Sequence, residues 1–393
     1  MYYDALVIGA GPSGSRVAWR LAEANLKVAL IEEDSIVGEP CQCAGLVTPR
    51  TIDYLNYDIP ILGEMSGARL WGPQNSFLEF QANETKALVI NRPDLDRSIA
   101  DKAVSAGAVL MTNTQYLGFS RIDSHLKVTL QSENKTIELE TELIIGSDGP
   151  ASRVARDAEL QTSREVLAAF GGDVEGLTTK ENHVELFVGS EVAPRFFAWI
   201  IPTGESTGRL GLATSLPSRP KKYFWDLFKK GAPSALLENA KIVNRISGLI
   251  PFGLRNPAYS DNVILTGDAA GMAKPTSGGG IYSGLVSADA AVDTAILAFQ
   301  KGDLSASTLK RYQFLIESDF AKELKLGSYL RRAFVELSDS QLAEIINSLN
   351  DPKIKKTIQE YGDLDYASAV AFAVLKVKPQ MIKFAPLLLK PFV

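Results

Sequence analysis

A glycine-rich turn near the start of the chain constrains the fold more than any other feature of the sequence. The turn follows a short apolar run at 4–9. It precedes helix-type spacing of apolar residues at 15–25, and a second apolar run occupies 27–32. Its glycines follow the pattern G-x-G-x-x-G and are Gly9, Gly11 and Gly14. This order of strand, glycine turn, helix and strand is typical of a parallel sheet that binds a dinucleotide.

Each part of this turn has a physical task in holding a dinucleotide. The first glycine permits a tight turn, the second lets the backbone approach a pyrophosphate, and the third lets the helix pack against the strand. The amides around Ser13, at the helix N-terminus, offer a partial positive charge to the phosphates. Glu32 ends the second strand, where its carboxylate can bind both ribose hydroxyls and disfavours a 2′-phosphate. The pattern predicts FAD or NAD(H) rather than NADP(H); the plain alternative is a glycine turn with a surface glutamate.

Two later glycine motifs resemble signatures of the para-hydroxybenzoate hydroxylase-like flavoproteins. Asp148 and Gly149, in the run LIIGSDG, are similar to that group's D-G motif, which closes on the pyrophosphate. Asp268, in TGDAA, stands where the group's aspartate contacts the ribityl chain, and Arg92, in NRPDLDR, where the group places an FAD-contacting arginine. The resemblance implies that the nucleotide is FAD. An ordinary Asp-Gly turn and a surface arginine are the structural alternatives.

The rest of the chain completes an α/β fold with a discontinuous first domain. Short strands at 66–90 predict an antiparallel layer, a helix is expected at 93–107, and separate strands are expected at 136–140 and 143–149. After about residue 304 the pattern is helical. We expect a Rossmann-type FAD-binding domain, an inserted antiparallel-sheet substrate domain and a C-terminal helical region. The FAD-binding domain comprises 1–65, 90–165 and 259–303. The substrate domain comprises 66–89 and 166–258, and the helical region comprises 304–393.

A glycine run lies just past Asp268, in the segment PTSGGGI. Gly279, Gly280 and Ile281 would let backbone amides approach the N1–C2=O edge of the isoalloxazine ring. Negative charge develops at this edge when the flavin is reduced. We therefore expect the run to bind the flavin end of FAD.

A cysteine loop resembles the geranylgeranyl reductase family more specifically. In GEPCQCAGL, Pro40 is followed three residues later by Cys43, which matches the family's P-x-x-C spacing, and Cys41 is extra. In that family the cysteine lies beside the flavin and the substrate. The resemblance implies that Cys43 and Ala44 lie at the site; two small buried cysteines without a chemical role are the alternative.

The segment FAWIIP at 197–202 resembles the family's Y-x-W-x-F-P motif, which lies on the sheet facing the flavin. Trp199 and Pro202 are retained, but Phe197 replaces the tyrosine and Ile201 replaces the second aromatic residue. The resemblance implies a catalytic-site position for Trp199 in a wall that is more apolar and lacks a phenol. An aromatic strand that packs in the core is the alternative.

The family resemblance implies an enzyme that saturates isolated double bonds of geranylgeranyl chains, as in archaeal-type ether phospholipids. Reduced flavin would deliver a hydride from N5, and the thiol of Cys43 or an ordered water would supply the proton in a water-poor pocket. A flavin-dependent monooxygenase or halogenase is the alternative, because W-x-I-P at 199–202 also resembles part of a halogenase motif. A flavin-binding protein without catalytic activity is the third reading.

Composition and charge exclude other classes of partner. The net charge of −5 gives no broad attraction for nucleic acid. Two histidines, His125 and His183, and one close cysteine pair cannot assemble a zinc site, so we expect no metal, and the cysteine usage fits a reducing cytoplasm. No second nucleotide fingerprint identifies the electron donor, which leaves NAD(P)H or a ferredoxin-like carrier.

Any membrane contact is expected at the surface of the bilayer. No export signal precedes the first strand, and the longest apolar window, 367–375, is about half the roughly 20 residues that span a bilayer. The segment 367–393 mixes apolar stretches with lysines, which suits a place on the inner face of the cell membrane or over a lipid tunnel. Packing on its own domain or at a dimer contact is the alternative.

Overall fold

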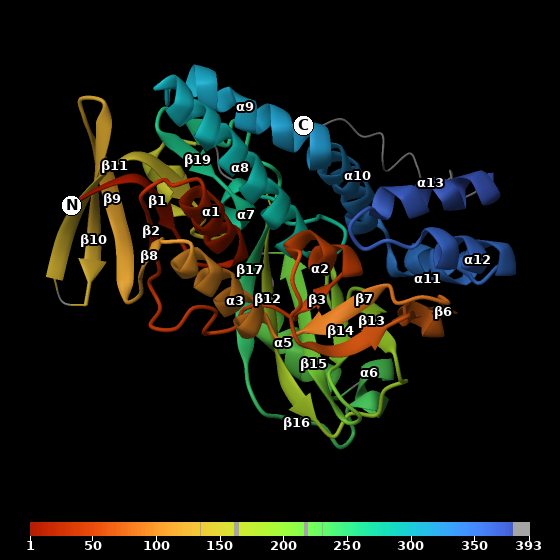
Figure 1. Ribbon diagram of the computed structural model, residues 1–393. Helices are drawn as coiled ribbons and strands as arrows, with labels where there is room; N and C mark the ends of the chain where they lie inside the picture. The colour runs from red at the N-terminus through yellow and green to blue at the C-terminus, as the bar shows by residue number, and fades with distance from the viewer. Residues whose placement is uncertain (134, 161–164, 216–218, 230, 380–393) are drawn as a thin grey trace.

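The computed structural model of the chain describes residues 1–133, 135–160, 165–215, 219–229 and 231–379. Figure 1 shows a first sheet with its helices on the left, a second sheet below, and a group of C-terminal helices on the right. This arrangement confirms the α/β class, with a parallel first sheet, an antiparallel second sheet and a helical C-terminal region.

The first sheet carries the glycine turn and is parallel at its centre. Its strands are β1 (Tyr2–Ile8), β2 (Val28–Ile31), β8 (Val109–Met111), β9 (Thr114–Ile122), β10 (His125–Ser132), β11 (Lys135–Gly146), β18 (Tyr259–Ser260) and β19 (Val263–Leu265). The order is β18-β19-β11-β1-β2-β8, in which the five strands from β19 to β8 run parallel. β9 and β10 extend the sheet from β11 as antiparallel strands.

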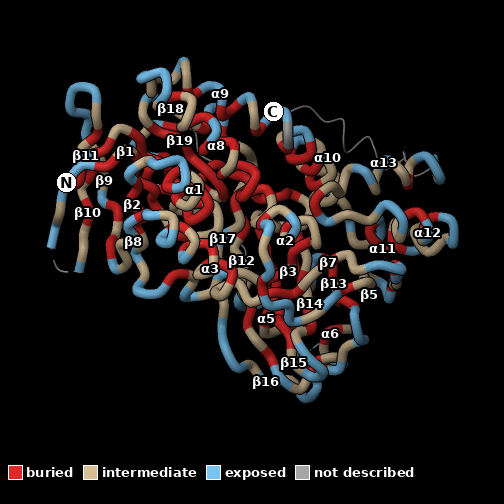
Figure 2. Tube along the Cα trace, viewed as in Figure 1, coloured by how far each residue is buried: buried red, intermediate tan, exposed pale blue. Residues whose placement is uncertain are grey.

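Three helices cover this sheet and complete its core. They are α1 (Pro12–Glu23), α3 (Arg92–Ser105) and α8 (Ile281–Lys301), and α1 packs against both of the others. The buried residues in Figure 2 concentrate in these helices and in the strands they cover. The sequence patterns predicted β1, α1, β2 and α3 to within a few residues, because β1 and β2 are short apolar runs, α1 has helix-type apolar spacing, and Pro93 and Gly107 mark the ends of α3.

One strand, β11, replaces the two that the sequence predicted at 136–140 and 143–149. Its first half lies in the antiparallel hairpin with β10, and its second half enters the parallel centre beside β1. Glu138, Glu140 and Glu142 look like a break in the apolar pattern. They lie instead on alternate positions of a continuous strand, where side chains point to the same face.

The second sheet is antiparallel except at one pair of strands. Its strands are β5 (Gly67–Trp71), β6 (Phe77–Gln81), β12 (Glu165–Glu175), β13 (His183–Val188), β14 (Phe197–Pro202), β15 (Thr207–Ser215), β16 (Lys241–Ile242) and β17 (Ile246–Phe252). The order is β16-β12-β15-β14-β13-β5-β6, and β17 also pairs with β12. β5 runs parallel to β13, which differs from the wholly antiparallel layer expected from 66–90. Two helices, α5 (Pro220–Leu227) and α6 (Gly231–Leu236), accompany this sheet, and α5 packs on β12 and β15.

A third, small sheet and several short elements connect these layers. β3 (Leu46–Val47), β7 (Ala87–Ile90) and β4 (Ile61–Met65) form the small sheet, so β7 does not join the layer predicted at 66–90. The short elements are α2 (Pro49–Leu55), the 3₁₀ turn η1 (Pro73–Asn75), α4 (Arg153–Asp157) and α7 (Gly267–Ala270).

The C-terminal region is helical, as expected. Its elements are α9 (Ala306–Ile316), the π-helical turn η2 (Glu317–Ala321), α10 (Lys322–Glu336), α11 (Asp339–Leu349), α12 (Pro352–Tyr361) and α13 (Ala367–Val377). α9 packs on α8 and on β18 of the first sheet, whereas α11 reaches β6 of the second sheet. The helices thus contact both large sheets.

α8 is long and apolar enough to cross a membrane by length and composition, which corrects the expectation that no window longer than 367–375 qualified. Most of this helix is buried inside the protein. Its small buried residues, among them Ser283, Gly284 and Ala288, pack against the first sheet and its helices rather than facing outward. α8 is a core helix.

Candidate active site

The glycine turn is shaped by close contact with the end of β11. Gly9 has a φ of 98°, and a Cβ atom there would lie 2.4 Å from the carbonyl oxygen of Ser147. A Cβ at Gly14 would lie 1.9 Å from the carbonyl oxygen of Gly9, whereas one at Gly11 would meet no protein atom within 4 Å. Gly11 alone of the three borders open space, at the N-terminus of α1, where phosphate groups are favoured.

The carboxylate of Glu32 is fixed beside this turn. It accepts hydrogen bonds from the backbone N–H groups of Ala10, at 2.8 Å, and Asp34, at 3.0 Å. Burial raises the pKa of Glu32, and the two hydrogen bonds oppose that rise. Glu32 is therefore an oriented, mostly enclosed side chain rather than a surface glutamate.

Ser13 joins the start of α1 to the elements that carry the later glycine motifs. Its hydroxyl oxygen lies 2.6 Å from the position of a Cβ at Gly267, in α7, and 2.5 Å from that of a Cβ at Gly284, in α8. A side chain at either position would require the Ser13 hydroxyl to move. The contact brings the first and third glycine motifs side by side, although they are far apart in the sequence.

Asp148 has a structural role in its own turn. Its Oδ1 accepts a hydrogen bond from Ser152 at 2.6 Å, and its Oδ2 accepts from the N–H groups of Arg153 and Val154 at 2.7 and 3.0 Å. These contacts cap the N-terminus of α4. Gly149, with a φ of 72°, borders open space instead. Of the predicted D-G pair, the glycine backbone is the part left free to approach a phosphate.

Arg92 and Asp268 lie near each other and differ in how they are paired. Arg92 binds both carboxylate oxygens of Asp96, at 3.0 and 2.8 Å, and its side chain is only 16% exposed, so it is not a surface arginine. Burial raises the pKa of Asp268 to about 6, and the charge of Arg92 opposes that rise. Among the residues that the structure describes, none donates a hydrogen bond to the Asp268 carboxylate. That carboxylate is free to accept a ligand hydroxyl.

The predicted glycine run lies between Asp268 and the second sheet. A Cβ at Gly280 would lie 2.9 Å from Oδ1 of Asp268. A Cβ at Gly278 would lie 3.3 Å from the side chain of Ile250 and 3.4 Å from the ring of Phe196. α8 begins at Ile281, so the run leads into a helix N-terminus.

The cysteine loop reaches the same strand of the second sheet. The backbone oxygen of Gln42 lies 3.5 Å from the Cβ position of Gly248, which is two residues before Ile250 in β17. Residues two apart share one face of a strand and lie about 7 Å apart. The cysteine loop and the glycine run therefore meet the second sheet at neighbouring positions.

The two cysteines of this loop are partly buried thiols. Cys41 donates to the carbonyl oxygen of Cys43 at 3.4 Å, and the N–H of Gly45 donates to the sulfur of Cys43 at the same distance. Burial raises the pKa of Cys41. Cys43 thus has its sulfur held by the backbone of its own loop.

Arg209, which lies in none of the sequence motifs, fixes this loop. Its Nη1 donates to the carbonyl oxygens of Ala44, at 2.8 Å, and Ile90, at 2.7 Å. A Cβ at Gly45 would lie 2.3 Å from the same nitrogen, so a residue with a side chain would clash there. An arginine within the apolar strand TGRLGLATS was the available signal, because a buried charge needs partners.

Trp199 lies in an aromatic group on the second sheet. Its indole ring packs on Gly211 of the neighbouring strand, where a Cβ would lie 2.6 Å from the ring, and it meets Phe197 edge-on at 6.0 Å. Phe197 stacks on Phe196 at 4.1 Å, and Arg331 of α10 lies over Phe196 at 5.2 Å. Trp199 is only partly buried, between two hydrophobic clusters. It therefore packs at the edge of the core, in the same hydrophobic cluster as Phe196 and Ile250, which the glycine run contacts.

These residues fit the shape and chemistry of FAD. The backbone is open at Gly11 and Gly149, the carboxylate of Glu32 is oriented beside the first glycine turn, and Asp268 lies next to Gly280 of the glycine run. Among the described residues, no group of three His, Cys, Asp or Glu side chains is placed to hold a metal ion. The fold and the site define a FAD-dependent flavoprotein.

Comparison with known proteins places the chain more closely. A family model described as an FAD binding domain matches residues 2–315. The digeranylgeranylglycerophospholipid reductase of Methanothrix thermoacetophila is 30% identical over 372 residues, which cover 91% of this chain and 93% of the relative. The chain belongs to this family of FAD-dependent oxidoreductases, the geranylgeranyl reductase-like group, and its cofactor is FAD.

Solved structures share the fold. A geranylgeranyl bacteriochlorophyll reductase-like protein from Thermoplasma acidophilum superimposes with a TM-score of 0.86 at 22% identity, and the match covers 99% of both chains. A flavin-dependent brominase gives 0.72 at 14% identity, covering 98% of this chain and all of the other. At these identities the likeness shows the fold alone.

Proposed function

We propose that this enzyme reduces isolated double bonds of geranylgeranyl chains, with archaeal-type ether phospholipids as the substrate class. The observation that carries the proposal is the meeting of the cysteine loop and the glycine run on one face of β17, beside the aromatic group around Trp199. The names of the similar archaeal proteins support the lipid class.

We assign the cofactor-binding residues from the same geometry. The ADP part would lie at the turn around Gly11 and beside Glu32, the pyrophosphate near Gly149, and the ribityl chain at Asp268. The flavin end would lie at the glycine run, in a unit built from 1–65, 90–165 and 259–303. The full set is Gly9, Gly11, Ser13, Gly14, Glu32, Cys43, Ala44, Arg92, Asp148, Gly149, Asp268, Gly279, Gly280 and Ile281.

FAD, when bound and reduced, supplies the hydride that an isolated alkene accepts only with difficulty. The chain contributes an apolar wall, in which Trp199 and Phe197 exclude water from one side of the alkene. In this proposal the thiol of Cys43 would orient the alkene or pass a proton to the carbon that does not receive the hydride. An ordered water held at the same loop is the other candidate for the proton source.

The electron donor is a nicotinamide or a ferredoxin-like carrier. The chain has one dinucleotide fingerprint, and the flavin occupies it in this proposal. NAD(P)H would therefore have to bind without its own Rossmann domain.

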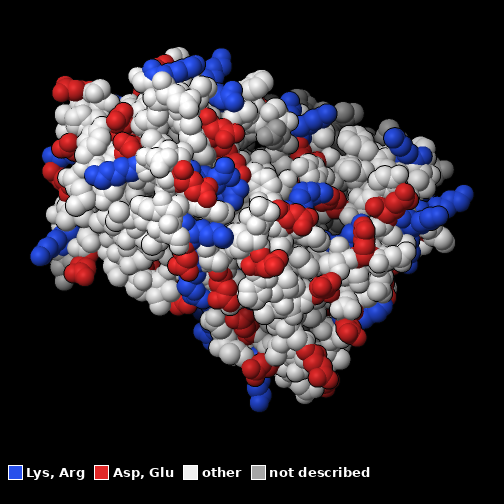
Figure 3. All heavy atoms as spheres, viewed as in Figure 1, with Lys and Arg blue, Asp and Glu red and all other residues white. Residues whose placement is uncertain are grey.

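We also propose that α13 rests on the inner face of the cell membrane, which would place the enzyme at the cytoplasmic surface where its lipid lies. Phe372 is 53% exposed and Val377 is 43% exposed on this helix. Figure 3 shows basic side chains close to α12 and α13, where Lys353, Lys356 and Lys376 are exposed. Apolar side chains beside lysines suit an anionic bilayer surface. The expectation for 367–393 falls in part on 380–393, which lie outside the described residues.

Anaerobic reoxidation of the flavin tests the proposal. Purified protein saturated with FAD is photoreduced and mixed with a geranylgeranyl ether phospholipid. The flavin absorbance should return, and mass spectrometry should show a gain of two hydrogens for each double bond reduced. A saturated phytanyl lipid is the matched control and should leave the flavin reduced.

Other outcomes would overturn the proposal. Lipid that stays unsaturated while the flavin remains reduced rejects the reductase. Substrate-dependent oxygen consumption with an aromatic compound would point to a monooxygenase or halogenase. Protein that stays colourless after incubation with excess FAD would reject flavin binding at this site.

A further inference from the structure

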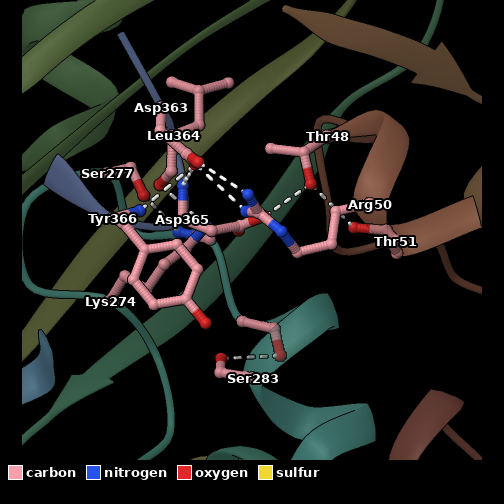
Figure 4. Close-up of polar contacts among 12 residues, drawn as sticks. Thr48, Arg50, Thr51, Lys274, Ser277, Ser283, Asp363, Leu364, Asp365 and Tyr366 are labelled. Atoms are coloured by element: carbon pink, nitrogen blue, oxygen red, sulfur yellow. Dashed lines mark hydrogen bonds and ion pairs between the residues drawn. The ribbon is translucent and has the colours of Figure 1, made fainter. Parts of the chain in front are cut away.

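A loop from the C-terminal region reaches the segment that carries the glycine run. The loop joins α12 to α13 and contains Asp363, Leu364 and Asp365. The ammonium group of Lys274 donates to Oδ1 of Asp365 at 2.5 Å and to the carbonyl oxygen of Leu364 at 3.0 Å (Figure 4). The side chains of Lys274 and Asp365 are only 9% and 2% exposed. This is a buried ion pair between residues that lie 91 positions apart.

The other oxygen of Asp365 is held from α2 and the residue before it. Thr48 donates to Oδ2 of Asp365 at 2.5 Å, and Arg50 lies 3.3 Å from the same oxygen. Arg50 also forms a bidentate pair with Asp363, at 2.8 and 3.2 Å (Figure 4). Asp365 is therefore fixed by Lys274, Thr48 and Arg50.

The side chain of Lys274 runs past the glycine run on its way to Asp365. A Cβ at Gly279 would lie 3.3 Å from Cε and 3.4 Å from Nζ of Lys274. Two backbone hydrogen bonds close the loop: the N–H of Lys274 donates to Gly279 at 3.0 Å, and the N–H of Gly278 donates to Lys274 at 2.8 Å. The ammonium group and the glycine amides thus belong to one small, rigid loop.

The C-terminal region also contacts the loop at 274–279 through α10. Gly327 of α10 lies against Pro275 and Thr276, where a Cβ would be 3.4 and 3.6 Å from their side chains. The loop at 274–279 is consequently contacted both by α10 and by the loop that joins α12 to α13.

We propose that Asp365 is a positioning residue of the flavin site, which neutralises Lys274 and thereby helps to set the reduction potential of the flavin. The inference rests on the proposed place of the flavin's N1–C2=O edge at the glycine run. Negative charge develops at that edge on reduction, so a nearby uncompensated charge changes the reduced form more than the oxidised form.

The sign of the effect follows from the charges. In the native protein Lys274 and Asp365 contribute a net charge of about zero beside the glycine run. Removing the carboxylate leaves an ammonium group that favours reduced flavin and raises the potential. Removing the ammonium group leaves a carboxylate that lowers it. A structural contact without electrostatic influence would not produce opposite shifts.

The midpoint potential of the FAD-saturated enzyme tests the proposal. We expect D365N to shift the equilibrium between oxidised and reduced flavin about tenfold toward reduction, which is ~30 mV for a two-electron couple. K274M should shift it by a similar factor toward oxidation, and the double variant K274M/D365N should return to the native potential. D363N is the comparison variant: it removes a carboxylate of the same loop whose partner, Arg50, is 40% exposed and screened by solvent, so it should shift the potential toward reduction by clearly less than D365N.

The outcomes separate this inference from the proposed function. Single variants that bind FAD but keep the native potential, or that shift it in the same direction, overturn the inference and leave the reductase proposal standing. A native protein that binds no FAD overturns both. If K274M does not fold, K274Q carries the same loss of charge while keeping a donor for Leu364 and Asp365.

Discussion

Arg209 donates a hydrogen bond of 2.8 Å to the carbonyl oxygen of Ala44 and so ties the cysteine loop to the second sheet. The same nitrogen holds the carbonyl oxygen of Ile90, two residues before Arg92. One buried side chain thus sets the position of the loop relative to the start of α3.

Replacing Arg209 with methionine should loosen this loop. The change leaves two buried carbonyl oxygens without their donor, which costs about 1–3 kcal/mol of unfolding free energy. Denaturant unfolding measures the loss, and alkylation of Cys41 and Cys43 should become faster. R121M removes an exposed arginine and should change stability by less than about 0.5 kcal/mol. Equal alkylation rates in R209M and the native protein would contradict the role of Arg209.

Two alanine substitutions in the glycine turn should separate folding from FAD binding. G14A places a Cβ against the backbone oxygen of Gly9 and should destabilise the protein by about 3 kcal/mol or more. G11A, where φ is −65° and no protein atom is near, should fold normally but lose at least about tenfold in FAD affinity, because the methyl group enters the pyrophosphate space. Thermal unfolding of the apoprotein and FAD titration measure the two effects. Native FAD affinity in G11A would show that the pyrophosphate lies elsewhere.

Asp268 should make the apoprotein less stable as the pH rises. Burial raises its pKa from 3.8 to about 6, so the folded state binds a proton more tightly than the unfolded state between these values. Stability should therefore fall from about pH 4 to pH 6, by up to ~3 kcal/mol. D268N should remove this dependence, gain stability at pH 7 and bind FAD more weakly. An apoprotein whose stability is flat over this range, and equal to that of D268N, would argue against the enclosed carboxylate.

The two cysteines should differ in their effect on lipid reduction. C43S should slow reoxidation of the flavin by a geranylgeranyl lipid by about 10²-fold if the thiol passes the proton, which is the lower end of general acid effects. C41S should leave the rate within about twofold of the native value, since Cys41 is the extra residue of the loop. Rapid-mixing absorbance under anaerobic conditions measures both rates. A native rate in C43S would transfer the role to an ordered water.

A single charge on α13 should weaken membrane binding. Burying a phenylalanine side chain at the bilayer surface contributes about 1.5–3 kcal/mol to the free energy of membrane binding. F372D should therefore lower partition into vesicles by about tenfold or more. Co-sedimentation with anionic phosphatidylglycerol vesicles measures the partition. F314D, at a phenylalanine that is 68% exposed on α9, is the matched control and should bind like the native protein. Equal losses in both variants would place the contact on another surface or show general misfolding.

Local patterns were enough to predict the parts of the site that follow one another in the chain. The glycine turn and Glu32 were identified because strand, turn and helix each have a short-range signal. The D-G motif alone did not indicate that the carboxylate of Asp148 also accepts hydrogen bonds from the first residues of the following helix.

Contacts between distant segments were not accessible in this way. Nothing near Lys274 in the sequence indicates Asp365, and nothing near Gly248 indicates Gln42. These pairs form only when the second sheet and the C-terminal helices are packed on the first sheet. The parallel pairing of β5 with β13 was missed for the same reason, because strand patterns show which face is buried but not which strand is the neighbour.

The first sheet draws β1 and β19 from opposite ends of a segment of more than 260 residues, with β11 between them. During synthesis β1 and the glycine turn leave the ribosome long before β19 and α8. The nascent chain must therefore hold exposed apolar strands until α8 emerges, and a yellow product can form only late in translation. Chains interrupted before residue 281 should accumulate as colourless, aggregation-prone fragments.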